Sequence, residues 1–137
     1  MAILDANVLV RYLVRDDPDL TQRSLLFLER IRDGGLEAVL LEGVIAEVVF
    51  VLSSKRLYAV EREVIRDRLL PVLNLPGILS EQKHIYARAL DIFVQYRRLS
   101  FVDALCVAHA ENEDNDRTVL SFDRGFRNIP GLNWVQP

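Results

Sequence analysis

Four carboxylates in this sequence stand where an acid suits chemistry better than simple surface charge. Two of them directly follow short apolar runs expected to be buried strands, and two lie within apolar stretches expected to be helices. The four are Asp5, Glu47, Asp103 and Asp123. Carboxylates that converge repel one another strongly unless a cation neutralises them. Oxygen ligands without a Cys or His cluster favour hard ions, so the set predicts one or two Mg²⁺ or Mn²⁺ ions and phosphoryl chemistry.

Three of these acids also have an ordinary structural explanation. Asp5 is placed to cap the helix that follows it, and Asp123 is placed to open a turn. Asp103 stands three residues after Ser100, which is the spacing of a capping box. A prediction of chemistry therefore depends on the whole set rather than on any single acid.

Glu47 is harder to explain as a structural residue. It is the sole charge between residues 44 and 52, in a helix that is apolar almost all round and is predicted to be buried. A buried carboxylate needs a partner, a proton or a metal. A solvated stripe of Glu47 with Ser54 remains an alternative, and Glu42 is a rival acid near a predicted strand end.

Short apolar runs alternate with helical patterns along the chain, and these elements must position the acids. Strands are expected at residues 2–4, 38–41, 78–79, 118–122 and 133–135. Helices are expected at residues 8–14, 17–33, 43–54, 60–73, 80–97 and 100–111. The alternation predicts a single α/β domain with a mainly parallel sheet of four or five short strands, covered on both faces. Sites in such sheets form at the carboxyl ends of the strands, where Asp5 and Asp123 are expected.

Composition limits the class of protein. The 137 residues are 50% hydrophobic and 27% charged, as in an ordinary globular fold. A net charge of -3 argues against a basic surface over the whole chain, so contact with RNA would need local arginines or metal ions. The single cysteine, Cys106, is expected to be a buried thiol. The absence of a basic leader, and of any apolar run near the roughly 18 residues that cross a bilayer, predicts a cytoplasmic protein without a membrane segment.

Four stretches of the chain resemble the successive motifs of the PIN-domain ribonucleases, and most closely the VapC-type toxins of bacterial toxin–antitoxin pairs. These stretches read ILDANVLVRYL, VIAEVVFVL, SFVDALCVAHA and LSFDRGFRNIPGLNW. The resemblance spans residues 3–134. It implies a three-layer α/β/α sandwich with a central parallel sheet. It also implies a Mg²⁺- or Mn²⁺-dependent endoribonuclease, usually a homodimer that a cognate antitoxin inhibits.

The resemblance also assigns roles to individual residues. It implies that the four acids are the catalytic and metal-binding quartet. Asn7 matches a frequent polar supporter just after the first acid, and Ser121 stands where the family often has Thr. Candidate arginines for gripping RNA phosphates are Arg11, Arg15, Arg97, Arg98 and Arg124. Arg124 is the strongest of these candidates because it adjoins Asp123.

Two other functions are compatible with the sequence. Asp5 is in a suitable place for the covalent nucleophile of a phosphotransferase or phosphatase, although enzymes of the haloacid-dehalogenase type usually carry a second Asp where this chain has Asn7. A non-catalytic PIN-fold binding module is a further alternative. The stretch SLLFLERI, residues 24–31, has more apolar residues than one core face requires. An antitoxin segment, a homodimer contact or burial on two sides would each account for this surplus.

Overall fold

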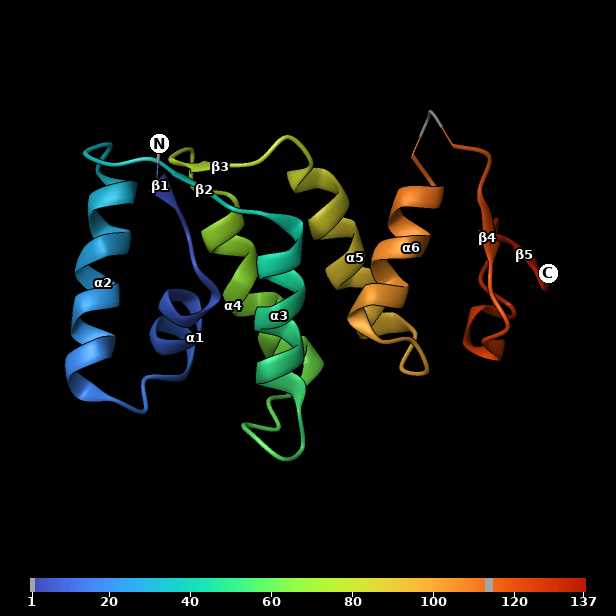
Figure 1. Cartoon of the computed structure of the whole chain (residues 1–137), viewed down its shortest axis with the longest axis horizontal. Helices are drawn as coiled ribbons and strands as arrows, with labels where there is room; N and C mark the ends of the chain where they lie inside the picture. Colours follow the sequence, from blue (N-terminus) through green and yellow to red (C-terminus); the bar gives the residue numbers. More distant parts are fainter. Residues whose placement is uncertain (1, 113–114) are drawn as a thin grey trace. The chain divides into compact units, whose positions relative to one another are not determined.

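Short parallel strands alternate with helices in the computed structural model, which describes residues 2–112 and 115–137 (Figure 1). The elements form two units, Met1–Lys83 and His84–Pro137. This arrangement confirms the α/β class, with parallel strands, that the sequence predicts. Hydrogen bonds group the five strands into two parallel sheets, with the order β1-β2-β3 in the first unit and β4-β5 in the second.

The three-stranded sheet brings together strand ends that are far apart in the sequence. Its strands are β1 (Ala2–Ile3), β2 (Ala38–Val39) and β3 (Ile78–Leu79). Beyond the strands, the backbone N–H of Leu4 donates to Val39 O, and that of Leu40 donates to Leu79 O, each at 2.9 Å. Because the three strands are parallel, their carboxyl ends lie at one edge, and the chain enters α1 and α3 from that edge.

Four helices belong to the first unit. They are α1 (Ala6–Val14), α2 (Pro18–Arg32), α3 (Glu42–Ser53) and α4 (Arg62–Leu73). The predicted start of α2 is confirmed, since Asp17 accepts a hydrogen bond from the Leu20 N–H at 3.0 Å and Pro18 is the first helical residue. Helix α1 packs against both α2 and α3, and α3 also packs against α4. The helix that follows Asp5 is therefore a neighbour of the helix that contains Glu47.

The second unit combines two helices with a two-stranded sheet. Its elements are α5 (Lys83–Gln95), α6 (Phe101–Ala110), β4 (Thr118–Leu120), the 3-10 helix η1 (Arg124–Phe126) and β5 (Asn133–Val135). The rings of Phe93 and Phe101 meet edge to face with centroids 5.8 Å apart. The indole N–H of Trp134 donates to Ser121 O at 2.9 Å, which ties β5 to the end of β4.

Cys106 differs from its prediction. The residue is exposed on α6, and it is not the buried thiol that its apolar neighbours suggested. The inward face of α6 consists of other positions, including Leu105 and Val107, so position 106 points away from the core. Among the described residues, the helices are too short or too polar to span a membrane.

Candidate metal centre and nucleic-acid interface

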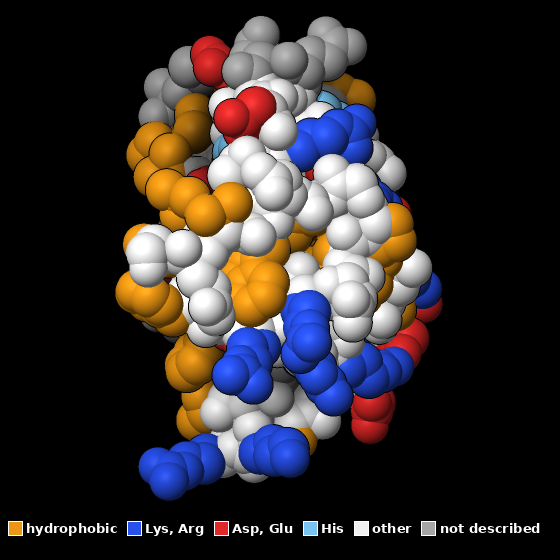
Figure 2. Space-filling view, turned by 90° about the vertical axis from the view of Figure 1, so that its right-hand side faces the viewer, with side chains coloured by type: hydrophobic (Ala, Val, Ile, Leu, Met, Phe, Trp, Pro, Cys, Tyr) orange, Lys and Arg blue, Asp and Glu red, His pale blue; other side chains and the backbone are white. Residues whose placement is uncertain are grey.

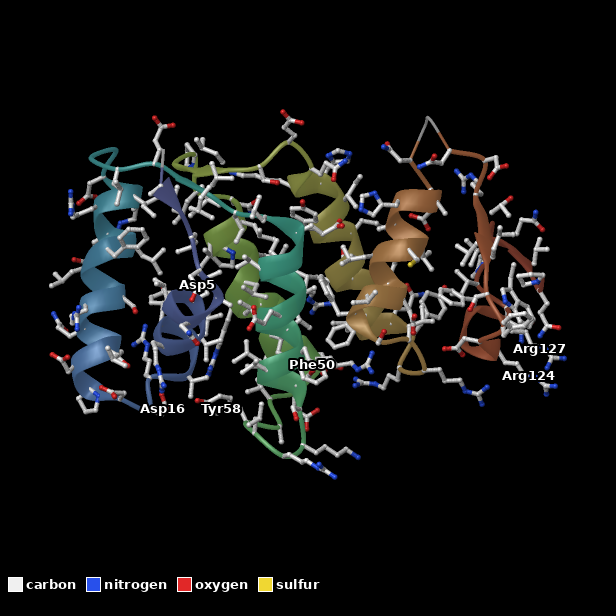
Figure 3. All side chains as sticks on the ribbon, in the orientation of Figure 1. Asp5, Asp16, Phe50, Tyr58, Arg124 and Arg127 are labelled. Carbon is white, nitrogen blue, oxygen red and sulfur yellow. The ribbon has the colours of Figure 1, made fainter. Side chains whose placement is uncertain are left out.

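Asp5 lies between β1 and α1, at the carboxyl end of the first strand, as predicted. It is the N-cap of α1, and its Oδ2 atom accepts the backbone N–H of Asn7 at 3.2 Å. The side chain is exposed at the start of the helix (Figure 3). A carboxylate has two oxygens, so capping with one of them is compatible with metal ligation by the other. The bond comes from the backbone N–H at position 7, which any residue except proline would supply, so the supporting role of the Asn7 side chain stays a prediction.

Glu47 is exposed on α3, and the prediction that it is buried is wrong. The buried face of α3 is formed by Ile45, Val48, Val49 and Leu52. The ring of Phe50, one turn after Glu47, is 70% exposed and marks the opposite face. The apolar composition of the stretch does not indicate burial at position 47, because one of its large apolar residues, Phe50, faces outward. Glu42, the rival acid, is half-buried in the first turn of α3.

Asp103 forms the predicted capping box at the start of α6. Its Oδ2 atom accepts the backbone N–H of Ser100 at 3.1 Å, and its own N–H donates to the Ser100 hydroxyl at 3.1 Å. The side chain is half-buried. These reciprocal bonds fix the direction of the carboxylate relative to the helix axis.

Asp123 is held in a similar way at the start of η1. Its Oδ1 atom accepts the Gly125 N–H at 2.7 Å, and its own N–H donates to the Ser121 hydroxyl at 3.0 Å. A Cβ at position 125 would lie 3.1 Å from Asp123 Oδ1 and 3.3 Å from Arg98 O, so glycine permits a close approach here. Asp123 therefore lies near the backbone of Arg98, in the turn between α5 and α6. The capping box that contains Asp103 begins two residues after Arg98, at Ser100.

The four acids share one donor chemistry and are divided between the two units. Three of them, Asp5, Asp103 and Asp123, have one carboxylate oxygen held by a backbone N–H. Within residues 2–112 and 115–137, no group of three or more His, Cys, Asp or Glu side chains is placed to hold a metal ion. The first unit contains Asp5 and Glu47, and the second contains the other two acids. Carboxylate oxygens fit a hard divalent cation.

Two of the candidate arginines follow the first acid, and both have contacts within the first unit. Arg11 donates to Asp16 at 2.9 Å, and the hydroxyl of Tyr58 donates to the second oxygen of Asp16 at 3.0 Å (Figure 3). The Tyr58 hydrogen bond lowers the pKa of Asp16, and the bond to Asp16 raises the pKa of both Tyr58 and Arg11. Arg15 donates to Tyr12 O at 3.3 Å and lies 5.6 Å from the Tyr12 ring centroid.

The remaining candidate arginines lie in the second unit. Arg97 and Arg98 are exposed in the turn between α5 and α6, and Arg124 is exposed as the first residue of η1. Arg127, which the sequence reasoning did not single out, is exposed at the end of η1, and its N–H donates to Arg124 O at 3.0 Å. The sequence does contain an indication of this candidate, because Arg127 stands three residues after Arg124, about one helical turn away.

A groove of about 450 Å³ lies between α1 and α2 in the first unit. It is lined by Asn7, Val8, Arg11, Leu20, Arg23, Ser24 and Phe27. The fold uses much of the apolar surplus of α2, since Leu28 and Ile31 are buried. Leu26 is 50% exposed and remains as outward apolar surface.

Comparison with known proteins gives one positive finding. The family model for the PIN domain matches residues 2–132, which include all four acids and every candidate arginine. Among curated proteins, no significant match was found.

Proposed function

The chain belongs to the PIN-domain family, and on that basis we propose that it is a divalent-metal-dependent endoribonuclease that hydrolyses RNA phosphodiester bonds. PIN domains are generally nucleases and typically use divalent metals. We propose that Asp5, Glu47, Asp103 and Asp123 act as one set that holds one or two Mg²⁺ or Mn²⁺ ions. A bound ion supplies Lewis acidity, which activates water and stabilises charge that develops on the phosphate.

The observation that best supports this proposal is that a backbone N–H group holds one carboxylate oxygen in each of three of the acids. The N–H groups of Asn7, Ser100 and Gly125 hold one oxygen of Asp5, Asp103 and Asp123 at 3.2, 3.1 and 2.7 Å. These bonds restrict the side-chain rotation of each acid, so less conformational freedom is lost when the second oxygen becomes a ligand. Asp17 has a bond of the same kind as the N-cap of α2, so the support comes from the three restrained acids together with the family match.

The other site residues have supporting roles in the proposal. Glu47 lies on a longer, exposed side chain, which suits it to complete the ligand set or to orient the attacking water. Ser121 positions Asp123 because its hydroxyl accepts the Asp123 N–H at 3.0 Å. The backbone N–H of Asn7 holds Asp5 at the start of α1, and we propose the Asn7 side chain as a further polar supporter of the site. Arginines near these acids bind RNA phosphates, with Arg124 the nearest in sequence to a proposed ligand.

The biological role that we propose is the toxin of a VapC-type toxin–antitoxin pair, acting in the cytoplasm as a homodimer under the control of a cognate antitoxin. The order and spacing of the four motifs support this role. The exposed Leu26 and the half-buried Phe27, which lines the α1–α2 groove, offer apolar surface to an antitoxin segment. Identification of a co-purifying antitoxin, and its inhibition of cleavage, would test this part of the proposal.

A cleavage assay on total and transfer RNA tests the enzymatic part. The purified protein is expected to cleave RNA with Mg²⁺ or Mn²⁺, and EDTA or the Asp5→Asn substitution is expected to abolish cleavage. Asp19→Asn is the matched control, because Asp19 is a solvent-exposed acid in the first turn of the neighbouring helix α2. Equal cleavage by the Asp5→Asn protein would contradict the assignment.

A further inference from the structure

A pocket of about 460 Å³ lies at the carboxyl end of helix α1, within the first unit. The end of α1 and part of α4 form it, and its lining residues are Tyr12, Leu13, Val14, Arg15, Arg68 and Pro71. Asp5 caps the other end of α1, which has nine residues. At about 1.5 Å per residue, Asp5 lies about 13 Å from the pocket along the helix axis. The pocket is therefore separate from this proposed metal ligand.

Two guanidinium groups line the pocket, and each keeps donors that have no protein acceptor. Arg68 donates through Nη1 to Leu13 O at 3.0 Å, and Arg15 donates through Nε to Tyr12 O at 3.3 Å. These bonds satisfy carbonyls in the last turn of α1, which is an ordinary role for arginine at a helix end. A guanidinium group has five N–H donors. Within residues 2–112 and 115–137, neither arginine has a further hydrogen bond or an ion pair.

The acids beside these arginines in the sequence have other partners. Asp16 directly follows Arg15, but its two oxygens accept hydrogen bonds from elsewhere in the first unit. Asp67 directly precedes Arg68 and pairs with Arg66 instead, at 3.0 Å. Exposed Lys and Arg side chains are common on this protein, as the face drawn in Figure 2 shows, so charge alone does not mark a site. The two pocket arginines differ because they share a hollow that no acid of the described residues lines.

The backbone at Arg15 gives an independent indication. This residue is the C-cap of α1 and has a φ of 61° and a ψ of 37°, in the left-handed region. Glycine adopts this conformation without strain, whereas a Cβ atom makes it unfavourable. The chain therefore has an arginine where the backbone favours glycine. Strained positions of this kind cluster at ligand sites, so the Arg15 side chain is expected to do more than end the helix.

The charge and size of the pocket favour a small molecule that carries a phosphate group. Guanidinium groups match phosphate oxygens in pairs, and two of them balance the charge of a phosphate monoester, about -1.5 to -2 at pH 7. The pocket volume lies in the range of small-molecule sites, about 300–1,000 Å³. Tyr12 and Pro71 offer apolar surface to the rest of such a molecule. A strand of RNA fits less well, because it needs a continuous basic track and an acid adjoins each arginine in the sequence.

We propose that Arg15 and Arg68 bind the phosphate group of a small phosphate monoester, whose remaining atoms lie against Tyr12 and Pro71. The bound molecule joins the end of α1 to α4 and so stabilises the first unit by mass action. The site goes beyond the proposed ribonuclease function and does not depend on it, since none of the four proposed metal ligands is among the lining residues.

Calorimetry and thermal unfolding with phenyl phosphate test the site. The assays use the full chain in a buffer free of phosphate and sulfate, with EDTA present so that no metal ion binds the added compound. Phenyl phosphate should bind one to one and raise the Tm. Inorganic phosphate should bind more weakly, because it has no part that contacts the apolar wall. Benzyl alcohol, which has a similar ring without the charge, should leave the Tm unchanged.

Substitutions at the two arginines separate this site from general surface charge. Arg15→Gln and Arg68→Gln should each weaken binding of phenyl phosphate by about 10-fold or more, because each removes charge-assisted hydrogen bonds. Arg30→Gln is the matched control, because Arg30 is exposed on α2 and lies outside the pocket lining. It should change the dissociation constant by less than about twofold, since solvent screens a distant surface charge.

Arg15→Gly separates a loss of binding from a loss of folding. Glycine suits the left-handed backbone at this position, so the Arg15→Gly protein is expected to fold with a Tm close to or above that of the wild type. It should nevertheless bind phenyl phosphate as weakly as the Arg15→Gln protein does. Undiminished binding by a folded Arg15→Gly protein would show that the arginine does not contact the phosphate.

Other results would also overturn the proposal. Absence of phenyl phosphate binding to the wild-type protein would contradict it, as would equal losses in the Arg15→Gln and Arg30→Gln proteins. Equal or tighter binding of inorganic phosphate would indicate a site for the free ion rather than for a monoester. Binding of an oligoribonucleotide that requires Arg15 and Arg68, without binding of phenyl phosphate, would assign both arginines to RNA instead. RNA cleavage enters none of these readings, so this proposal and the ribonuclease function fail separately.

Discussion

Asp103 allows the structural and the catalytic work of one carboxylate to be separated. In the structure its Oδ2 atom accepts the Ser100 N–H at 3.1 Å, and in the proposal its charge helps to hold a metal ion. Asp103→Asn keeps an oxygen that can accept this bond but removes the charge. Asp103→Ala removes both. The two substitutions should therefore differ in their effect on folding and agree in their effect on cleavage.

The expected sizes of the two effects, on stability and on cleavage, follow from the hydrogen bond and the charge that each substitution removes. Loss of one half of the capping box should lower the free energy of unfolding by about 0.5–1.5 kcal/mol, or about 2–6 °C in Tm for a chain of this size. Asp103→Ala is expected to show this loss, and Asp103→Asn less than about 0.5 kcal/mol. Both should lower kcat/KM for RNA cleavage by about 100-fold or more, because weakened metal binding costs several kcal/mol of transition-state stabilisation.

Ser100→Ala is the matched control for this pair. It removes the other half of the capping box, the bond from the Asp103 N–H to the Ser100 hydroxyl, and leaves the carboxylate in place. It should cost about 1 kcal/mol of stability and change cleavage less than about tenfold. Tm from thermal unfolding and initial cleavage rates at fixed Mg²⁺ provide the two readings. Near-wild-type cleavage by the Asp103→Asn protein would show that the charge of Asp103 is not needed for cleavage. Equal losses of activity in the Ser100→Ala and Asp103→Asn proteins would also contradict a metal-binding role for this carboxylate.

Two further predictions concern the fold of the first unit. The Tyr58 hydrogen bond lowers the pKa of Asp16, so its stabilisation is present above the ordinary Asp pKa of about 4 and is lost as the pH falls through the lower, folded value. In urea titrations the wild-type protein should therefore exceed Asp16→Asn in stability at neutral pH, with a gap that narrows below about pH 4; a constant gap would contradict this cause. Gly77→Ala should destabilise the protein by about 1–3 kcal/mol, because the added Cβ would lie 2.8 Å from Ile31 Cγ2 and 3.0 Å from two backbone oxygens. An unchanged urea midpoint for Gly77→Ala would show that this packing is looser than described.

Local signals in the sequence predicted much of the secondary structure. Asp17 followed by Pro18 marked the start of α2, and Ser100 with Asp103 marked the start of α6, because side-chain caps act on backbone groups within a few residues. The start of α5 was placed too early, at Ser80, whereas the helix begins at Lys83. The hydroxyl of Ser80 accepts the Gln82 N–H at 3.4 Å within a turn, so a capping residue alone did not locate the helix.

Burial was harder to predict from the sequence than element type. Glu47 and Cys106 were both expected to be buried because their neighbours are apolar, and both are exposed. The composition of a segment describes all faces of a helix together, whereas the exposure of one residue depends on which face packs against other elements. Phe50 and Phe122 show the same limit, since each is a large apolar residue on the outside of its element.

The central claim is that the four acids act as one metal-binding set, and titration with Mn²⁺ followed by electron paramagnetic resonance tests it most directly. The wild-type protein should bind one or two ions. Asp5→Asn, in the first unit, and Asp103→Asn, in the second, should each weaken the same binding event by about tenfold or more. If either substitution leaves Mn²⁺ binding unchanged, or if the two affect separate and independent ions, the four acids do not form one metal site.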